Sequence, residues 1–289
     1  MTRAVDDPLA LPTAQSLVLL LFAEHFGIEK GCETRQLLAA TDAFARIPYE
    51  NLTKIIKESL AGSPERARRL PLEVIEDHKA LGAGGTCFSL TAALLHIVRA
   101  LGWRAEPILA DRHYGADTHC ALLVWLDGRA HLLDPGYLIT TPIAIEGAGS
   151  VAATGSVRRP TAFHEVELVQ SAPGRVDLFT RTGRSRTLRL TYKSAPADPS
   201  AFLRAWDTSF SWDMMRYPLL TRVRGGEQIY LQENRLQVRG RDAVSRREVD
   251  PEKLAPAIAQ EFGIAPSMAE RALEILRGKG ELRGRAPTP

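Results

Sequence analysis

The sequence predicts an α+β fold in which a helical region, an antiparallel sheet and a mixed region follow one another along the chain. Three observations support this prediction. Apolar residues recur with helical spacing through most of the first hundred positions. Short apolar runs separated by turn residues fill positions 103–193, as in antiparallel sheets and barrels. The last part of the chain combines helices with a hairpin, so unlike elements are segregated rather than alternating.

The first region, 1–102, is expected to be a helical subdomain. Apolar positions repeat near the helical period in four segments, which we expect to be helices: 14–30, 34–47, 71–80 and 87–101. Gly27 and Gly102 are suited to ending the first and the last of these helices. Pro48 interrupts the helical pattern after the second one.

The second region, 103–197, is expected to be an antiparallel β-barrel, and the third, 198–289, an α/β unit. The strand-like runs of the second region are 104–112, 119–126, 130–134, 165–170, 175–180 and 187–192. In the third region we expect a helix over 198–210 and a hairpin over 227–240. Two helices follow, and Ser267 is expected to open the second of them.

The composition is that of an ordinary globular protein and excludes several classes of function. The net charge of +3 is spread along the 289 residues, which argues against a nucleic-acid partner. No apolar run reaches the ~18 residues that a membrane span needs. Cys32, Cys87 and Cys120 are too few for a disulfide framework, and no export signal is evident, so free thiols in a cytoplasmic protein are expected. No His or Cys spacing indicates a metal site, and the oligomeric state is left open.

The stretch THCALLVWLDGRAHLLDPGY (118–137) predicts a hairpin that brings two polar side chains together. Asp127 and Gly128 between two apolar runs are typical of a tight two-residue turn. With that turn, the alternation of side chains along a strand places His119 and Asp134 on one face as diagonal neighbours. The hairpin therefore presents an imidazole within reach of a carboxylate.

Cys87 is the candidate nucleophile. It follows two glycines and begins a predicted helix, where the positive end of the helix dipole favours a thiolate. With His119 as base and Asp134 orienting it, the three residues form a set for nucleophilic catalysis. Each of the three alone is more often structural, as a core thiol, a strand histidine or a turn former. The other Cys and His residues that we considered are expected to be structural: Cys32, His96, His113, Cys120 and His131.

Four segments resemble motifs of the arylamine N-acetyltransferases, in the same order and at suitable spacing. They are IPYENL (47–52), GGTCF (84–88), THCALLV (118–124) and LLDPGY (132–137). Weaker similarity extends the resemblance over most of the chain, about 14–265. It implies a cysteine-protease-like core in which the first region carries the nucleophile, the barrel carries the histidine and the aspartate, and the third region is a lid.

The resemblance also implies a reaction. Cys87 takes an acetyl or other acyl group from a coenzyme A thioester, such as acetyl-CoA, and an aromatic amine or hydrazine then attacks the acyl-cysteine in a ping-pong scheme. His119 moves the protons and Asp134 orients it. No metal is required. Residues expected to line the substrate pocket beside this triad are Phe88, Thr118, Gly136 and Tyr137.

The sequence departs from the family pattern at several places, among them Ser89, which stands where the family often has Glu or Gln, and a compact segment before His119. Ala83 stands where the family has an arginine that is thought to pair with the residue equivalent to Glu50. Glu50 must therefore find another cation or water, and Ala83→Arg is expected to be tolerated if Glu50 keeps the family's orientation. Asp134 is followed by Pro135, as in transglutaminase-like proteins. The alternatives are thus a transglutaminase-like thiol amidase or peptidase, an amide synthase of a biosynthetic pathway, and a non-catalytic binding homologue.

Overall fold

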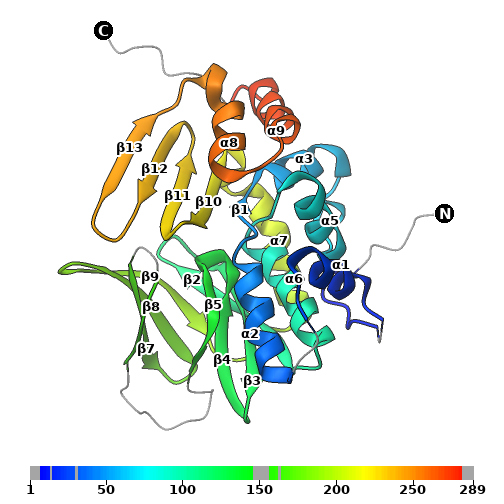
Figure 1. Cartoon of the computed structure of the whole chain (residues 1–289), viewed down its shortest axis with the longest axis vertical. Helices are drawn as coiled ribbons and strands as arrows, with labels where there is room; N and C mark the ends of the chain where they lie inside the picture. Colours follow the sequence, from blue (N-terminus) through cyan, green and yellow to red (C-terminus); the bar gives the residue numbers. More distant parts are fainter. Residues whose placement is uncertain (1–6, 14, 30–31, 146–155, 162–163, 282–289) are drawn as a thin grey trace.

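The protein consists of a layer of helices, a β-barrel and a second sheet that is capped by two further helices (Figure 1). It is described from a computed structural model that covers residues 7–13, 15–29, 32–145, 156–161 and 164–281. None of the helices within those ranges is long and apolar enough to cross a membrane. The predicted α+β class with segregated elements is confirmed.

The first region is helical, as predicted, and contains two helices that the sequence pattern did not indicate. Its helices are α1 (Leu17–Phe26), α2 (Glu33–Phe44), α3 (Leu52–Ala61), α4 (Pro64–Ala67), α5 (Pro71–Leu81) and α6 (Cys87–Ala100). Helix α3 was not predicted because it follows directly on the break at Pro48, although Leu52, Ile55 and Ile56 have the apolar spacing of a helix.

The barrel is an antiparallel sheet of two four-stranded halves. Its strands are β2 (Ala105–Arg112), β3 (Gly115–Leu126), β4 (Arg129–Asp134), β5 (Ile139–Ala144), β6 (Ser156–Pro160), β7 (Glu165–Ala172), β8 (Arg175–Thr182) and β9 (Ser185–Lys193). They are ordered β5-β4-β3-β2-β9-β8-β7-β6, and each half is a series of hairpins. The halves meet where β2 pairs with β9, with Ala110 opposite Tyr192 and Asp111 opposite Thr191.

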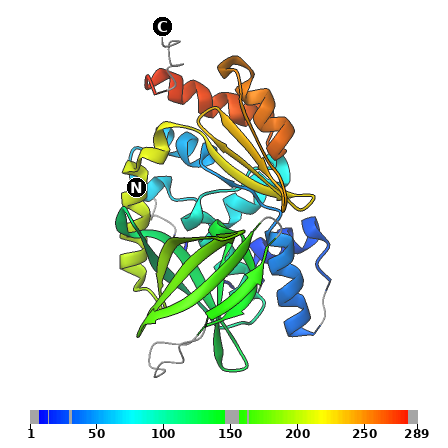
Figure 2. The same ribbon diagram turned by 90° about the vertical axis from the view of Figure 1, so that its left-hand side faces the viewer.

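The third region contributes a second antiparallel sheet and the last helices. Its elements are α7 (Pro199–Thr208), β10 (Leu219–Arg224), β11 (Glu227–Gln232), β12 (Arg235–Arg239), β13 (Val244–Glu248), α8 (Leu254–Phe262) and α9 (Pro266–Gly278). The predicted hairpin is present as β11 and β12. Ser267 does not open the last helix, which begins at Pro266 with Ala265 as its N-cap. Figure 2 shows this sheet lying over one end of the barrel.

One strand of the second sheet comes from the first region. Strand β1 (Tyr49–Glu50) pairs with β10, so that Tyr49 lies opposite Thr221 and Glu50 opposite Leu220. The IPYENL segment therefore runs between the cysteine-bearing helices and the sheet above the barrel. Helix α3, which follows it, packs against α9.

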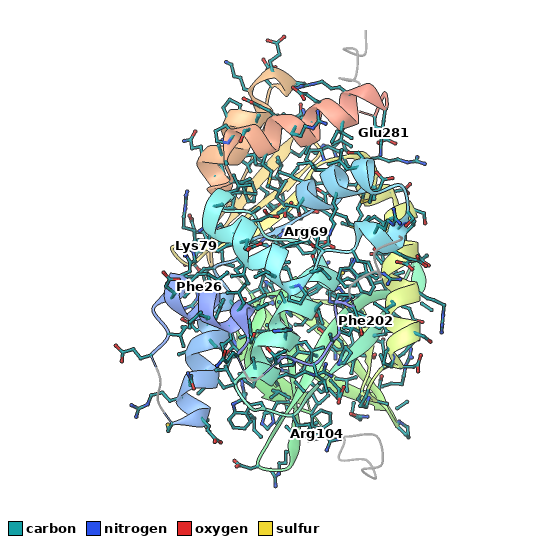
Figure 3. All side chains as sticks on the ribbon, turned by 90° about the vertical axis from the view of Figure 1, so that its right-hand side faces the viewer. Phe26, Arg69, Lys79, Arg104, Phe202 and Glu281 are labelled. Carbon is teal, nitrogen blue, oxygen red and sulfur yellow. The ribbon has the colours of Figure 1, made fainter. Side chains whose placement is uncertain are left out.

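Three hydrophobic clusters hold these layers together. The first lies between the helices and the outer face of β2–β4 and includes Phe88 and Phe202, the latter labelled in Figure 3. The second joins α3 to the third region, and the third fills the barrel. Because the second cluster combines Leu52 with residues beyond position 200, the boundaries at 102 and 197 remain a prediction.

Candidate active site

The hairpin formed by β3 and β4 has the predicted turn and register. Asp127 and Gly128 both have positive φ, of 49° and 74°, and Leu126 faces Arg129 across the turn. At the far end of the hairpin, His119 Nε2 lies 2.6 Å from Asp134 Oδ2, and both side chains are fully buried. A local turn of two residues is thus sufficient to set the geometry of this pair.

Asp134 is held by three donors. Besides His119, its carboxylate accepts a hydrogen bond from the Tyr192 hydroxyl at 2.6 Å and one from the backbone N–H of Tyr137 at 2.8 Å. Strand β9 brings Tyr192 to this position where it pairs with β2. The sequence analysis missed Tyr192, since no local pattern indicates which residue of β9 meets the carboxylate.

Cys87 is the first residue of α6, as predicted, and its side chain is buried. Cys87, His119 and Asp134 all pack closely against Gly136. A Cβ added at Gly136 would lie 3.0 Å from Cys87 Cβ, 3.0 Å from His119 Cε1 and 3.3 Å from Asp134 Oδ1. The structure therefore brings the three candidate catalytic residues around one glycine, where nothing larger fits without displacing them.

The surroundings of Cys87 favour the thiolate. Its pKa lies well below the usual thiol value, chiefly because of the neighbouring Cys120 thiol. Burial acts in the opposite direction, whereas a hydrogen bond to His119, the charge of His119 and the charge of Arg112 all lower the pKa further. Burial raises the pKa of Cys120, which therefore stays protonated and donates to Thr91 Oγ1.

The sequence analysis placed Cys120 on the strand face opposite His119 and expected a structural role for it. Cys120 and Cys87 belong to the same hydrophobic cluster, because helix α6 packs on the face of β3 that carries Cys120. The Cys120 Sγ also lies 3.5 Å from Thr91 Oγ1, one helical turn beyond Cys87. The structural role expected for Cys120 stays a prediction, and the Cys120 thiol in addition lowers the pKa of the candidate nucleophile.

Asp134 and Arg112 together set the protonation of His119. Burial alone would lower its pKa, but the charge and the hydrogen bond of Asp134 outweigh burial, so the pKa lies above the usual histidine value. A guanidine N–H of Arg112 lies 3.1 Å from His119 Nδ1. Because an arginine can only donate, Nδ1 accepts there and the imidazole proton resides on Nε2, facing Asp134.

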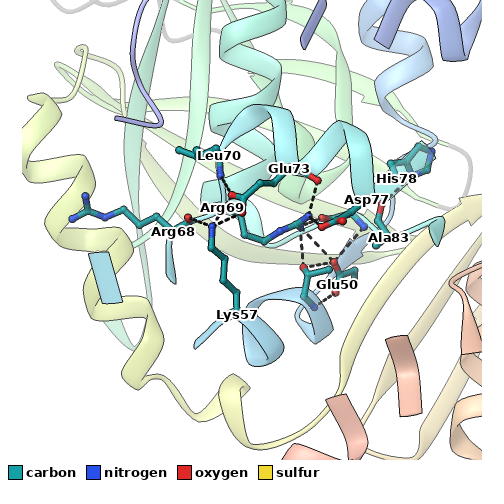
Figure 4. Close-up of polar contacts among 11 residues, drawn as sticks. Glu50, Lys57, Arg68, Arg69, Leu70, Glu73, Asp77, His78 and Ala83 are labelled. Carbon is teal, nitrogen blue, oxygen red and sulfur yellow. Dashed lines mark hydrogen bonds and ion pairs between the residues drawn. The ribbon is translucent and has the colours of Figure 1, made fainter. Parts of the chain in front are cut away.

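Glu50 has the cation that the sequence left unassigned. Arg69, in the linker between α4 and α5, lies 4.0 Å from Glu50 Oε1, and both side chains are buried (Figure 4). The same guanidinium donates to Gly84 O and, at 2.9 Å, to Thr53 Oγ1. It also forms an ion pair with Asp77 at 2.6 Å.

Glu50 and Arg69 together hold the loop that precedes Cys87. Glu50 Oε1 accepts from the backbone N–H of Gly84 at 3.2 Å, while Arg69 donates to the carbonyl of the same residue. Ala83, where the family's arginine would stand, is fully buried. Since Arg69 already supplies the positive charge, the expectation that Ala83→Arg is tolerated is withdrawn.

The glycine pair of this loop is required by close packing. A Cβ at Gly84 would lie 1.8 Å from Pro48 O, and one at Gly85 would lie 2.2 Å from Ser89 Oγ. Gly85 also forms a parallel bridge with Tyr49 of β1. The two glycines thus let the loop run directly against the IPYENL segment and deliver Cys87 at the start of α6.

Lys54 is a second buried cation that the sequence analysis missed. Its ammonium donates to Ser209 O at 2.8 Å and lies 4.4 Å from the centre of the Phe210 ring. Burial lowers its pKa to about 7, although the charges of Cys87 and Cys120 act to raise it. No apolar or motif pattern marks Lys54, because it lies in the unpredicted helix α3.

A cavity of about 620 Å³ lies between the barrel and the second sheet. Cys87, His119 and Asp134 are not among its lining residues, but Gly136, which packs against all three, is. Gly136 and Tyr137, both predicted to line a substrate pocket, line it. Its other lining residues are polar and aromatic apart from three leucines: Tyr49, Arg112, His113, Tyr114, Leu138, His164, Thr180, Thr187, Leu188, Arg189, Leu219, Thr221, Gln228, Tyr230, Gln237 and Arg239.

The structure does not place the other two predicted pocket residues on this cavity. Phe88 points into the core, where its ring lies 5.3 Å from Phe202 and 5.9 Å from Trp206. Its position directly after Cys87 on the helix turns it away from the hairpin. The Thr118 hydroxyl is occupied within the β2–β3 turn, where it donates to Gly115 O at 2.9 Å.

Comparison with solved structures identifies the fold. The arylamine N-acetyltransferase from Mycobacterium abscessus matches with a TM-score of 0.74 at 18% identity, covering 91% of this chain and 96% of that chain. The Bacillus cereus enzyme, described as having a unique Cys-His-Glu catalytic triad, matches with a TM-score of 0.69 at 15% identity, covering 87% and 100%. The Mycobacterium marinum enzyme in complex with CoA gives 0.69 at 16% identity, covering 89% and 98%.

Sequence comparison alone finds no relative. No protein-family model matches the chain, and no curated protein matches it. The likeness therefore rests on three-dimensional structure, where nearly the whole of each chain is matched. This chain has the fold of the arylamine N-acetyltransferases.

Proposed function

We propose that the protein is an acyl-CoA-dependent N-acyltransferase of the arylamine N-acetyltransferase type, in which Cys87 carries the acyl group between donor and acceptor. The observation that carries this proposal is the convergence of Cys87, His119 and Asp134 on Gly136, which itself lines the cavity. The fold supports it, because solved structures of this type include one in complex with CoA.

The first half-reaction loads Cys87. The thiol proton passes to His119 Nδ1, and the resulting thiolate attacks the carbonyl carbon of the acyl thioester. The oxyanion that forms needs hydrogen-bond donors. Helix α6 has no side-chain cap at its N-terminus, so its first backbone N–H groups are free to serve that oxyanion. Collapse of the intermediate expels the CoA thiolate, which takes a proton from His119, and leaves acyl-Cys87.

The second half-reaction transfers the acyl group to an amine. The amine nitrogen attacks acyl-Cys87, and His119 Nδ1 accepts the proton that the nitrogen loses. Asp134 stabilises the imidazolium through its 2.6 Å contact with Nε2, while Tyr192 and the Tyr137 N–H keep the carboxylate in place. The Cys87 thiolate is then released and the amide departs.

Mass spectrometry of the intact protein tests the first half-reaction directly. After incubation with acetyl-CoA and removal of the excess, we expect a gain equal to one acetyl group on Cys87, lost again on addition of an aromatic amine. Cys87→Ser is the blank. Asp134→Asn should slow loading by orders of magnitude, as loss of an orienting carboxylate does in related triads.

Alkylation by iodoacetamide separates the alternatives if no acyl-CoA gives an adduct. Because the pKa of Cys87 is lowered, its alkylation should remain fast below pH 8, where an ordinary thiol with a pKa of about 8.5 slows. Fast alkylation without any acyl adduct would favour the thiol amidase. If Cys87 is alkylated no faster than glutathione, the result would favour a non-catalytic binding protein.

A further inference from the structure

The cavity has an unusual balance of charge for a site that receives a neutral amine. Three arginines line it, Arg112 from β2, Arg189 from β9 and Arg239 from β12, whereas its lining residues include neither aspartate nor glutamate. Within the described part of the chain, none of the three forms an ion pair with a carboxylate. The cavity is therefore positive.

Arg112 is the arginine next to the reacting groups. One of its terminal nitrogens donates to the Tyr114 hydroxyl at 2.7 Å, and the other lies 3.1 Å from His119 Nδ1. Neither partner is a carboxylate. Other arginines of comparable burial pair with carboxylates, such as Arg68 with Asp207 at 2.5 Å. The charge of Arg112 favours the Cys87 thiolate, but among the described residues no carboxylate forms an ion pair with Arg112, unlike the usual case for a half-buried guanidinium.

We propose that Arg112 receives a carboxylate of the substrate, held within a few bonds of the reacting carbonyl carbon. This inference rests on the proposed acyl transfer through Cys87. The phosphates of the CoA donor do not meet the requirement, because the long pantetheine arm separates them from the thioester that must reach Cys87. The carboxylate belongs either to the acyl group, as in a dicarboxylic acyl thioester, or to the amine, as in an aminobenzoate.

A carboxylate at Arg112 also changes the state of His119. In the free protein Arg112 donates to Nδ1, the nitrogen that must take up a proton during transfer. Once His119 is an imidazolium, its Nδ1 carries a proton, so this N–H and the N–H of Arg112 would be two donors facing each other. A bidentate carboxylate draws the guanidinium toward the cavity and frees Nδ1. An anionic substrate is therefore expected to raise kcat as well as to lower KM.

Two alkylating reagents of nearly equal size test the inference without any acyl transfer. Iodoacetate carries a carboxylate next to its reacting carbon, whereas iodoacetamide is neutral. We measure the ratio of their second-order rate constants at Cys87 and divide it by the same ratio for glutathione. We expect this normalised ratio to be about tenfold above one in the wild-type protein, the effect of one charge-assisted hydrogen-bonded pair.

Variants assign the effect to Arg112. The normalised ratio should fall to about one in Arg112→Gln and take an intermediate value in Arg112→Lys, which keeps the charge without the fork. Arg129→Gln is the control of equal charge, because Arg129 is exposed at the opposite end of the hairpin. A wild-type ratio near one, or a ratio that Arg112→Gln leaves unchanged, would overturn the inference even if acyl transfer is observed.

Paired substrates then identify which substrate carries the carboxylate. A kcat/KM for 2-aminobenzoate above that for 2-aminobenzamide, lost in Arg112→Gln, assigns it to the amine. A preference for succinyl-CoA over butyryl-CoA, lost in the same variant, assigns it to the acyl group. Transfer without either preference contradicts the inference. Absence of all transfer contradicts the proposed function, and the alkylation ratio then still decides whether Arg112 binds a carboxylate.

Discussion

Replacing Arg69 with methionine is the substitution that most directly tests how the cysteine loop is held. Arg69 is almost wholly buried and donates to Thr53, Gly84 and the Glu73 carbonyl, besides its ion pair with Asp77. Methionine retains much of the volume but none of these donors. The variant leaves Glu50, which is fully buried, without a neighbouring cation.

The loss of stability expected for Arg69→Met follows from these contacts. Breaking a buried ion pair by removing one partner costs about 3–5 kcal/mol, because the remaining charge stays buried. The unfolding entropy of a 289-residue chain is about 0.6 kcal/mol per kelvin at about 2.1 cal/mol/K per residue. The Tm of Arg69→Met should therefore fall by about 5–8 °C.

Thermal unfolding followed by far-UV circular dichroism measures the fall in Tm. Arg68→Met is the matched control. Arg68 is adjacent in sequence and pairs with Asp207, but both side chains are partly exposed, at 12% and 25%. Its loss should cost about 1 kcal/mol, or about 2 °C. Cys87 alkylation, read in parallel, should slow in Arg69→Met alone, because only Arg69 contacts the loop.

A double-mutant cycle with Glu50→Gln decides whether the charge pair is responsible. Removing both charges leaves no buried unpaired ion, so the double variant should lose about 1–3 kcal/mol less than the two single losses combined. Strict additivity of the single effects, or a Tm shift of Arg69→Met no larger than that of Arg68→Met, would refute the reasoning.

Three further predictions concern single positions. Gly136→Ala should lower kcat/KM at least about 100-fold by displacing Cys87 and His119. Gly278→Ala, whose added Cβ meets open space, should leave kcat/KM unchanged. Equal activities of the two variants would contradict the packing at Gly136. Burial lowers the pKa of Lys54 from 10.5 to about 7, so between these pH values the unfolded state binds more protons and stability rises with pH. Lys54→Met should therefore raise Tm at pH 6 and have little effect at pH 10. An equal change of Tm at both pH values would contradict the lowered pKa. Ala83→Arg should lower Tm by several degrees, because the site is fully buried and a cation is already present; an unchanged Tm would show that the loop has room.

The sequence was informative where structure is local. The turn at Asp127 and Gly128 fixes the register of one hairpin, and alternation along its strands is enough to bring His119 to Asp134. The start of α6 at Cys87 likewise follows from a glycine pair and a helical apolar pattern. Each of these features depends on residues within about twenty positions of one another.

The sequence was uninformative where distant segments meet. Tyr192 reaches Asp134 only because β9 pairs with β2, and Arg112 reaches the cavity because a second sheet covers the barrel. Phe88 was placed on the cavity because it follows Cys87, but consecutive helical residues point in different directions and it faces Trp206 instead. Such placements depend on packing between layers, which no single-segment pattern encodes.

The source of the positive charge at Glu50 bears on how proteins of this fold can be recognised. A motif search compares which residues stand side by side along the chain, and here the residue before the glycine pair is alanine. The guanidinium nevertheless arrives at Gly84 from a position 15 residues upstream. Coulomb's law depends on separation in space and not on sequence order, so the same local field can be supplied by another stretch of backbone. Searches keyed to the spatial arrangement of charge around the nucleophile loop would therefore find chains that adjacency-based profiles pass over.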